Sequence, residues 1–136
     1  MYYRLRTVLI LMAFCLHFSG CWGITTTPKR AMGRRFDSDV WRRADPNKEN
    51  DREIRGSMVD DLIDRKLLDG LTAKETEELL GPPLSAEDRK MAGMADVQGE
   101  LCYHLGPTRD VPIDEEFLMI RLDQAGRVVE YHVTPN

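Results

Sequence analysis

Residues 117–133 read FLMIRLDQAGRVVEYHV, and this stretch decides the fold. On both sides of the central DQAG, side chains expected to face the core alternate with side chains expected to face away from it, as in two strands that each bury one face. Gly126 suits the left-handed position of a type I turn followed by a G1 bulge. The stretch therefore predicts an antiparallel β-hairpin. Its expected inward-facing residues are Leu118, Ile120, Leu122, Val129, Tyr131 and Val133.

Two helices are predicted ahead of the strands. Apolar side chains recur at spacings of three and four from Met58 onward, and Gly70 is the expected end of the first helix. Thr72 and Glu75 form a capping box at the start of the second helix. Gly81 is expected to end that helix in the left-handed conformation, before two prolines.

A long connection and a further strand complete the pattern. Ser85 is expected to start one extra helical turn, and Met91 and Met94 to cover part of the core. Alternation at residues 100–105 then predicts a strand that Gly106-Pro107 ends. The order predicts an α+β fold for residues 56–136, with a two-helix hairpin packed on one face of a three-stranded antiparallel sheet.

Composition allows one small domain and excludes several classes of protein. The chain has 136 residues, of which 42 % are hydrophobic and 31 % charged. A net charge of −4 without a long basic stretch argues against nucleic acid as a partner. Three Cys are too few for a disulfide scaffold.

The N-terminal residues are expected to form an export signal. Arg4 and Arg6 precede an apolar run at residues 8–16, which is shorter than the roughly 20 residues that span a bilayer. Phe18-Ser19-Gly20-Cys21 resembles the lipobox of bacterial lipoproteins, although Phe18 stands where an aliphatic residue is usual. The resemblance implies a signal peptide at residues 1–20 and acylation of Cys21. The alternative is an ordinary secretory signal with a chance Cys.

Acylation of Cys21 implies a lipid bilayer as the first partner, because two or more acyl chains anchor a protein stably. Trp22 follows where lipoproteins retained in the inner membrane typically carry Asp. The resemblance therefore implies a cell-envelope location, at the outer membrane facing the periplasm if the organism has two membranes.

Residues 21–55 are expected to form a tether and docking arm. They are polar, and from Lys29 to Arg55 they hold nine basic and six acidic residues, against eight and seventeen in residues 56–136. Phe36 and Trp41 are the large aromatic residues of the stretch at residues 36–41. Two interpretations stay open here: a flap packed on the chain's own domain, or an anchor that binds a partner.

The motifs together resemble the SmpA/OmlA family of small bacterial lipoproteins, over roughly residues 60–133. One member serves the machinery that assembles outer-membrane β-barrels, and the fold recurs in duplicate in the β-lactamase inhibitory protein. The resemblance implies a protein-interaction module, but the partner-binding segment of the assembly member is not matched. The motifs that carry the resemblance are Leu71-Thr72 with Glu75, residues 79–83, residues 100–103 and residues 118–128.

No catalytic or metal-binding motif is recognisable. His104 and His132 are expected on strands, facing solvent, and with Cys102 they fall short of a zinc motif. Cys102 is expected to be a half-buried thiol rather than a nucleophile, although it could pair with Cys21 if Cys21 is not acylated. The acidic clusters are expected to be solvated surface. We therefore predict no enzyme activity, no cofactor and no small-molecule substrate.

The sequence thus predicts a non-enzymatic, membrane-anchored lipoprotein that binds an envelope protein of unknown identity. The expected binding surfaces are the edge of the sheet and the arm that carries Phe36 and Trp41. The alternative is a soluble exported inhibitor of a hydrolase, with acidic loops such as Asp114-Glu115-Glu116 entering a basic cleft.

Overall fold

The computed structural model describes residues 33–108 and 113–136. The predicted signal peptide at residues 1–20 and the predicted acylation site Cys21 lie outside these residues. The described elements are α1 (Ser38–Arg43), α2 (Ile54–Asp64), α3 (Ala73–Leu80), α4 (Ala86–Met91), β1 (Glu100–Pro107), β2 (Glu115–Leu122) and β3 (Val128–Pro135). The three strands form one antiparallel sheet in the order β1-β2-β3, which confirms the α+β class.

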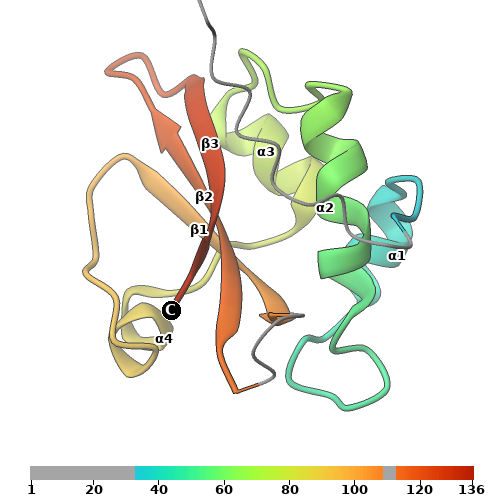
Figure 1. Cartoon of the computed structure of the whole chain (residues 1–136). Coiled ribbons are helices and arrows are strands. Elements are labelled where there is room, and N and C mark those ends of the chain that lie inside the picture. Colours follow the sequence, from blue (N-terminus) through green and yellow to red (C-terminus); the bar gives the residue numbers. More distant parts are fainter. Residues whose placement is uncertain (1–32, 109–112) are drawn as a thin grey trace, which may run out of the picture.

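Helices lie on both sides of this sheet. Figure 1 shows α1, α2 and α3 on one side and α4, at the lower left of the view, on the other. The side facing α2 and α3 holds the main core, which includes Trp41, Leu62, Leu80, Tyr103 and Ile120. Such a core comes from alternating strand residues and from the apolar stripes of the helices.

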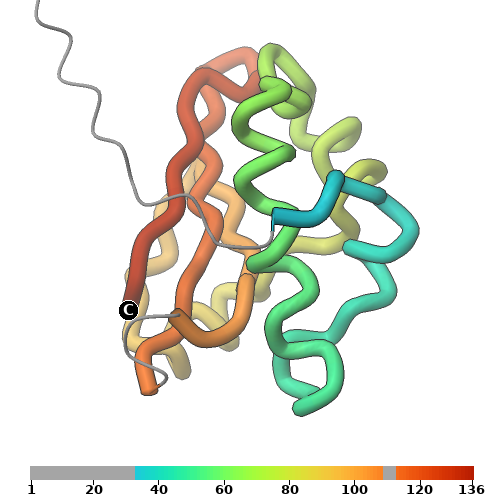
Figure 2. The backbone as a smooth tube through the Cα atoms, turned by 45° about the vertical axis from the view of Figure 1, so that its right-hand side comes forward, coloured from blue at the N-terminus to red at the C-terminus, as the bar shows by residue number. Residues whose placement is uncertain are grey.

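The folded domain begins earlier than residue 56. Figure 2 shows the chain after residue 33 lying across α2. The Arg34 amide donates to the Ser57 carbonyl at 2.7 Å, and the Phe36 amide donates to Asp61 Oδ2 at 2.8 Å. Asp37 caps α1, whose Trp41 side chain is fully buried. The boundary predicted at residues 55 and 56 is therefore wrong, because residues 34–55 supply part of the core.

Helix α2 starts and ends before the predicted positions. It begins at Ile54 and ends at Asp64, six residues ahead of Gly70. Lys66 has a φ of 53°, its amide donates to the Ile63 carbonyl, and the Leu67 amide donates to the Leu62 carbonyl. This pair of hydrogen bonds defines a Schellman motif. A Lys occupies the left-handed position that usually belongs to Gly, and this hid the helix end from sequence analysis.

The beginning of α3 confirms the capping box. Thr72 Oγ1 accepts from the Glu75 amide at 3.2 Å, and Glu75 Oε2 accepts from the Thr72 amide at 2.8 Å. Gly81 ends the helix as predicted, but with a φ of 83° and a ψ of −175°. Its φ is positive without being left-handed helical, a combination that is almost confined to Gly.

Two irregularities change which strand residues face the core. Between Arg121 and Leu122 the register of β2 with β3 shifts, so that Leu122 pairs with Val128. Val128 is buried and Val129 is 52 % exposed, the reverse of the prediction. In β1 a second shift follows His104, and the strand includes Gly106 and ends at Pro107, in agreement with the prediction that Gly106-Pro107 ends it. Gly126 has a positive φ, and its amide donates to the Asp123 carbonyl, in agreement with the predicted turn.

Helix α4 confirms the predicted extra turn but not its apolar role. Ser85 caps it by accepting from the Asp88 amide. Met91 is 75 % exposed, so the prediction that it covers the core is wrong. The side chain that α4 buries is Arg89, at 2 % exposure, and beneath it Cys102 is fully buried. The sheet therefore has a second covered face at this end.

Candidate functional site

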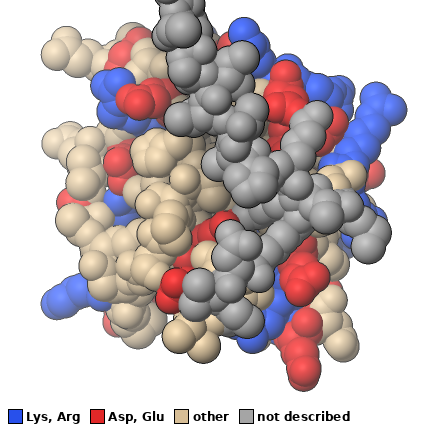
Figure 3. Space-filling view, in the orientation of Figure 1, with Lys and Arg blue, Asp and Glu red and all other residues tan. Residues whose placement is uncertain are grey.

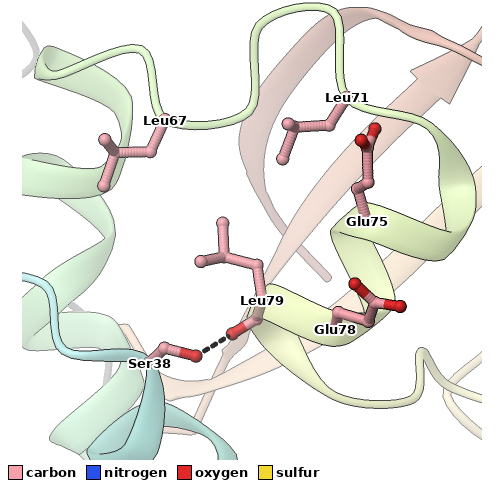
Figure 4. A pocket seen from close by; sticks show the side chains of 6 residues that line it. All are labelled: Ser38, Leu67, Leu71, Glu75, Glu78 and Leu79. Carbon is pink, nitrogen blue, oxygen red and sulfur yellow. Dashed lines mark hydrogen bonds between the residues drawn. The ribbon is translucent and has the colours of Figure 1, made fainter.

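A shallow groove lies where α3 meets the turn after α2. It is lined by Ser38, Leu67, Leu71, Glu75, Glu78 and Leu79, and we call it the leucine groove. Figure 4 shows Leu71 and Leu79 extending into the space between the turn and α3, with Leu67 across from them and the two glutamates at the opposite side. The three leucines are only partly buried, and the groove volume is about 370 Å³. It is thus an apolar hollow at the surface of a covered core.

Local sequence fixes the shape of the leucine groove. The Schellman turn at Lys66 redirects the chain, which brings Leu67 next to α3. The Leu71 carbonyl accepts from the Val128 amide at 2.8 Å, so this part of the turn is held to β3. On α3, Thr76 and Leu80 face the core, and Leu79 lies at its border. Ser38 closes the remaining side by donating through Oγ to the Leu79 carbonyl at 2.5 Å.

The charged side chains that line the leucine groove are both acidic. The backbone amide of Thr72, followed by its hydroxyl, holds the pKa of Glu75 below its usual value. Glu78 lies 3.8 Å from Lys74, and both side chains are well exposed. Residues 56–81 carry seven acidic and three basic residues. In the view of Figure 3, acidic and basic side chains alternate over the helices at the right, and uncharged ones dominate at the left.

A second groove lies on the other face of the sheet, between β3 and the loop after α4. Its volume is about 290 Å³, and it is lined by Arg89, Met94, Ala95, Val97, Glu100, Met119, His132, Thr134, Pro135 and Asn136. Arg89 Nη2 donates to Glu100 Oε1 at 2.5 Å, and Arg89 Nη1 lies 3.8 Å from Asp96. The buried cation is thus matched by carboxylates of this chain, and it joins α4 to β1.

Phe36 and Trp41 belong to the fold and not to an exposed anchor. Their rings lie 5.7 Å apart at an interplanar angle of 56°, and the guanidinium carbon of Arg55 lies 5.7 Å from the Trp41 ring centroid. Arg55 Nε also donates to the Trp41 carbonyl at 3.1 Å. Trp41 has no exposed surface and Phe36 packs against the core, so residues 36–41 lie on the chain's own domain, as the flap interpretation predicts.

The structure separates Cys102, His104 and His132. Met119 of β2 lies between Cys102 and His132 in the register of the sheet. Burial raises the pKa of the Cys102 thiol to about 11, which disfavours the thiolate that a nucleophile requires. His132 faces solvent as predicted. His104 does not: its side chain is 14 % exposed and stacks on Phe117 with a centroid distance of 5.1 Å.

Glu115 is engaged within the domain and does not stand on an acidic loop. Glu115 and Glu116 begin β2, which corrects the prediction that they lie in a loop. Glu115 Oε2 lies 2.8 Å from His104 Nε2, and Glu115 Oε1 accepts from Arg52 at 2.8 Å. A side chain held in this way is not presented to a hydrolase cleft.

One edge of the sheet is covered and the other is largely open. Along β1 the Cys102 carbonyl accepts from the Leu84 amide at 2.8 Å, and the His104 carbonyl accepts from Arg55 at 3.4 Å. Along β3 the described chain pairs only near Val128, through Leu71 and the bridge between Thr72 and Arg127. The predicted edge surface therefore exists only at β3.

Neither metal clusters nor membrane spans occur in the described part of the chain. Within residues 33–108 and 113–136 no group of three or more His, Cys, Asp or Glu is placed to hold a metal ion. The helices of the same residues lack the length and apolar character needed to cross a bilayer. Comparisons with models of protein families, with curated proteins and with solved structures found no match to this chain.

Proposed function

We propose that this protein is a non-enzymatic lipoprotein of the bacterial cell envelope, anchored through Cys21, whose folded domain binds other proteins. The observation that carries the proposal is the tetrapeptide Phe18-Ser19-Gly20-Cys21 behind a short apolar run. Trp22 after Cys21 favours the outer membrane, facing the periplasm, where two membranes exist.

The likeness to the SmpA/OmlA family supports an interaction role. The chain has four helices before its three strands, and the helix, helix, strand, strand, strand order of that family would correspond to α2, α3, β1, β2 and β3. Helices α1 and α4 would then be additions to the common arrangement. Binding surfaces available to a partner are the leucine groove and the outer edge of β3, since an open edge accepts a further strand.

The alternative of a soluble hydrolase inhibitor has less support. It rests on the fold resemblance to the β-lactamase inhibitory protein, and the Glu115 side chain that would enter a basic cleft is paired with Arg52 and His104.

Membrane fractionation tests the anchor. The full-length chain should sediment with membranes, and Cys21→Ser should move it to the soluble fraction, because the acyl chains supply the membrane affinity. Cys15→Ser, within the predicted signal peptide, is the matched control and should leave sedimentation unchanged. Intact mass should show a mature N-terminus at Cys21 carrying acyl groups. A Cys21→Ser protein that still sediments would exclude acyl anchoring.

A further inference from the structure

The leucine groove is pre-formed and shaped for a few apolar side chains. Its floor joins Leu67 and Leu71 from the turn to Leu79 from α3, and each of these contacts the main core. Backbone hydrogen bonds fix both sides, at Lys66 and at Leu71. A volume of about 370 Å³ lies at the small end of ligand pockets. It suits one turn of a helix, which presents apolar residues at spacings of three and four.

The charge at the leucine groove specifies what must flank those apolar residues. Glu75 and Glu78 are the charged residues that line it. The Glu78 carboxylate lies 3.8 Å from Lys74, with side-chain exposures of 86 % for Lys74 and 65 % for Glu78, and Arg42 donates to the Glu78 carbonyl at 3.3 Å. An ion pair between side chains this exposed contributes little free energy. Glu78 can therefore exchange Lys74 for a cation of an incoming segment, while Glu75 is oriented by the capping box.

From this geometry we infer that the leucine groove binds an amphipathic helix of a partner protein whose apolar face is flanked by Lys or Arg. The inference rests on the proposed interaction role and names the chemistry of the partner. A second copy that docks through its own leucine groove fits poorly, because Glu75 and Glu78 of the two copies would face each other.

A peptide titration tests the inference. The protein is the full exported chain with Cys21→Ser, so that binding does not depend on acylation. The probe is a fluorescein-labelled amphipathic peptide of about 18 residues built from Leu and Lys, and the control peptide replaces each Lys by Glu. The Lys peptide should bind at low salt at least about tenfold more tightly than the Glu peptide, and more weakly as salt rises. Amide shifts in the NMR spectrum should concentrate at Leu67, Leu71 and Leu79.

Matched charge reversals locate the site. Glu78→Lys should weaken the affinity for the Lys peptide by about three- to tenfold. Glu77→Lys lies on the same helix, changes the net charge equally and does not line the groove, so it should change affinity less than about twofold. Both variants should melt like the parent protein, because both side chains are exposed.

Several results would overturn the inference. Equal binding of the two peptides would show non-specific adhesion, and an equal effect of Glu77→Lys and Glu78→Lys would place the contact elsewhere. Self-association that protects the three leucines would make a second copy the occupant. If deletion of residues 22–32 raises the affinity for the Lys peptide by more than about fivefold, that segment of this chain is the occupant of the groove. The Cys21→Ser fractionation is independent of all these outcomes, so the two proposals can fail separately.

Discussion

Replacing Trp41 by Ala should remove a large part of the stability of the domain. Trp41 has no exposed surface. Buried aromatic side chains of its size contribute about 150–250 Å², which at about 25 cal/mol per Å² corresponds to roughly 4–6 kcal/mol. Measured Trp→Ala changes in cores cost about 3–5 kcal/mol. We adopt that range, because it also covers losing the contacts with Phe36 and Arg55.

Urea unfolding of the exported chain with Cys21→Ser measures this loss. Total stability for small domains is about 5–15 kcal/mol, so Trp41→Ala should remove a third or more of it in most of that range. The melting temperature should fall by at least about 12 °C. The chain has two Trp, so a Trp22→Phe background makes Trp41 the sole indole reporter. Its fluorescence should be blue-shifted and protected from iodide until the domain unfolds.

Phe36→Ala provides a graded comparison, since Phe36 is only partly buried. Phe36→Ala should lower the free energy of unfolding by about 1–2 kcal/mol, which is less than the effect of Trp41→Ala. A Trp41→Ala protein that keeps the parental melting temperature, or a Trp41 indole that iodide quenches in the folded state, would refute the assignment of this residue to the core.

Three further predictions concern the backbone and titrating groups. Lys66→Gly should raise the free energy of unfolding by about 0.5–1 kcal/mol in urea titrations, because Lys66 has a φ of 53°; no gain would contradict the Schellman assignment. Gly106→Ala should lower it by about 2 kcal/mol or more, since the new Cβ would lie 1.8 Å from the Arg52 carbonyl oxygen; a neutral result would show that the close approach is absent. Asp61 accepts from the Phe36 amide, which holds its pKa below 3.8, so its stabilising contribution is present above pH 4 and is lost as the pH falls through the lowered value. Asp61→Asn should therefore flatten the acid limb of thermal melts recorded from pH 6 to pH 2, and an unchanged acid limb would contradict this.

Much of the local structure could be predicted because its signals lie within a few residues of each other. The capping box of Thr72 and Glu75, the Ser85 cap and the turn at Gly126 each depend on one short stretch. Alternation along the strands likewise predicted the antiparallel sheet. In each case the competing conformations are excluded by local hydrogen bonds or by the φ that a turn requires.

The errors came from interactions between distant parts of the chain. Burial of Trp41 depends on Arg55 and on the core side chains, none of which marks residues 34–55 as part of the domain. One extra residue in β3 buries Val128 and exposes Val129, the reverse of the prediction. Such a bulge has no strong sequence signature. Cys102 is fully buried, and the α4 side chain Arg89 is held by Glu100 of the same strand, a contact that periodicity cannot indicate.

The leucine groove was missed for a related reason. Leu67, Leu71 and Leu79 each fit an apolar periodicity that predicts burial. Their partial exposure follows from the early end of α2 at Asp64, which depends on a Lys in a conformation that usually signals Gly. A Lys followed by two apolar residues gives no warning of such a turn.

The start of the packed domain at Arg34 has a consequence for encounter rates at a membrane. Only residues 22–33 separate it from Cys21, and twelve residues reach at most about 40 Å whatever path they take. For a chain acylated at Cys21, this segment confines the domain to a half-sphere of that radius above the membrane. One molecule in such a volume corresponds to a local concentration on the order of 10 mM. A docking site of millimolar affinity would then be mostly occupied while a partner lies within that reach, and mostly empty toward more dilute proteins beyond it.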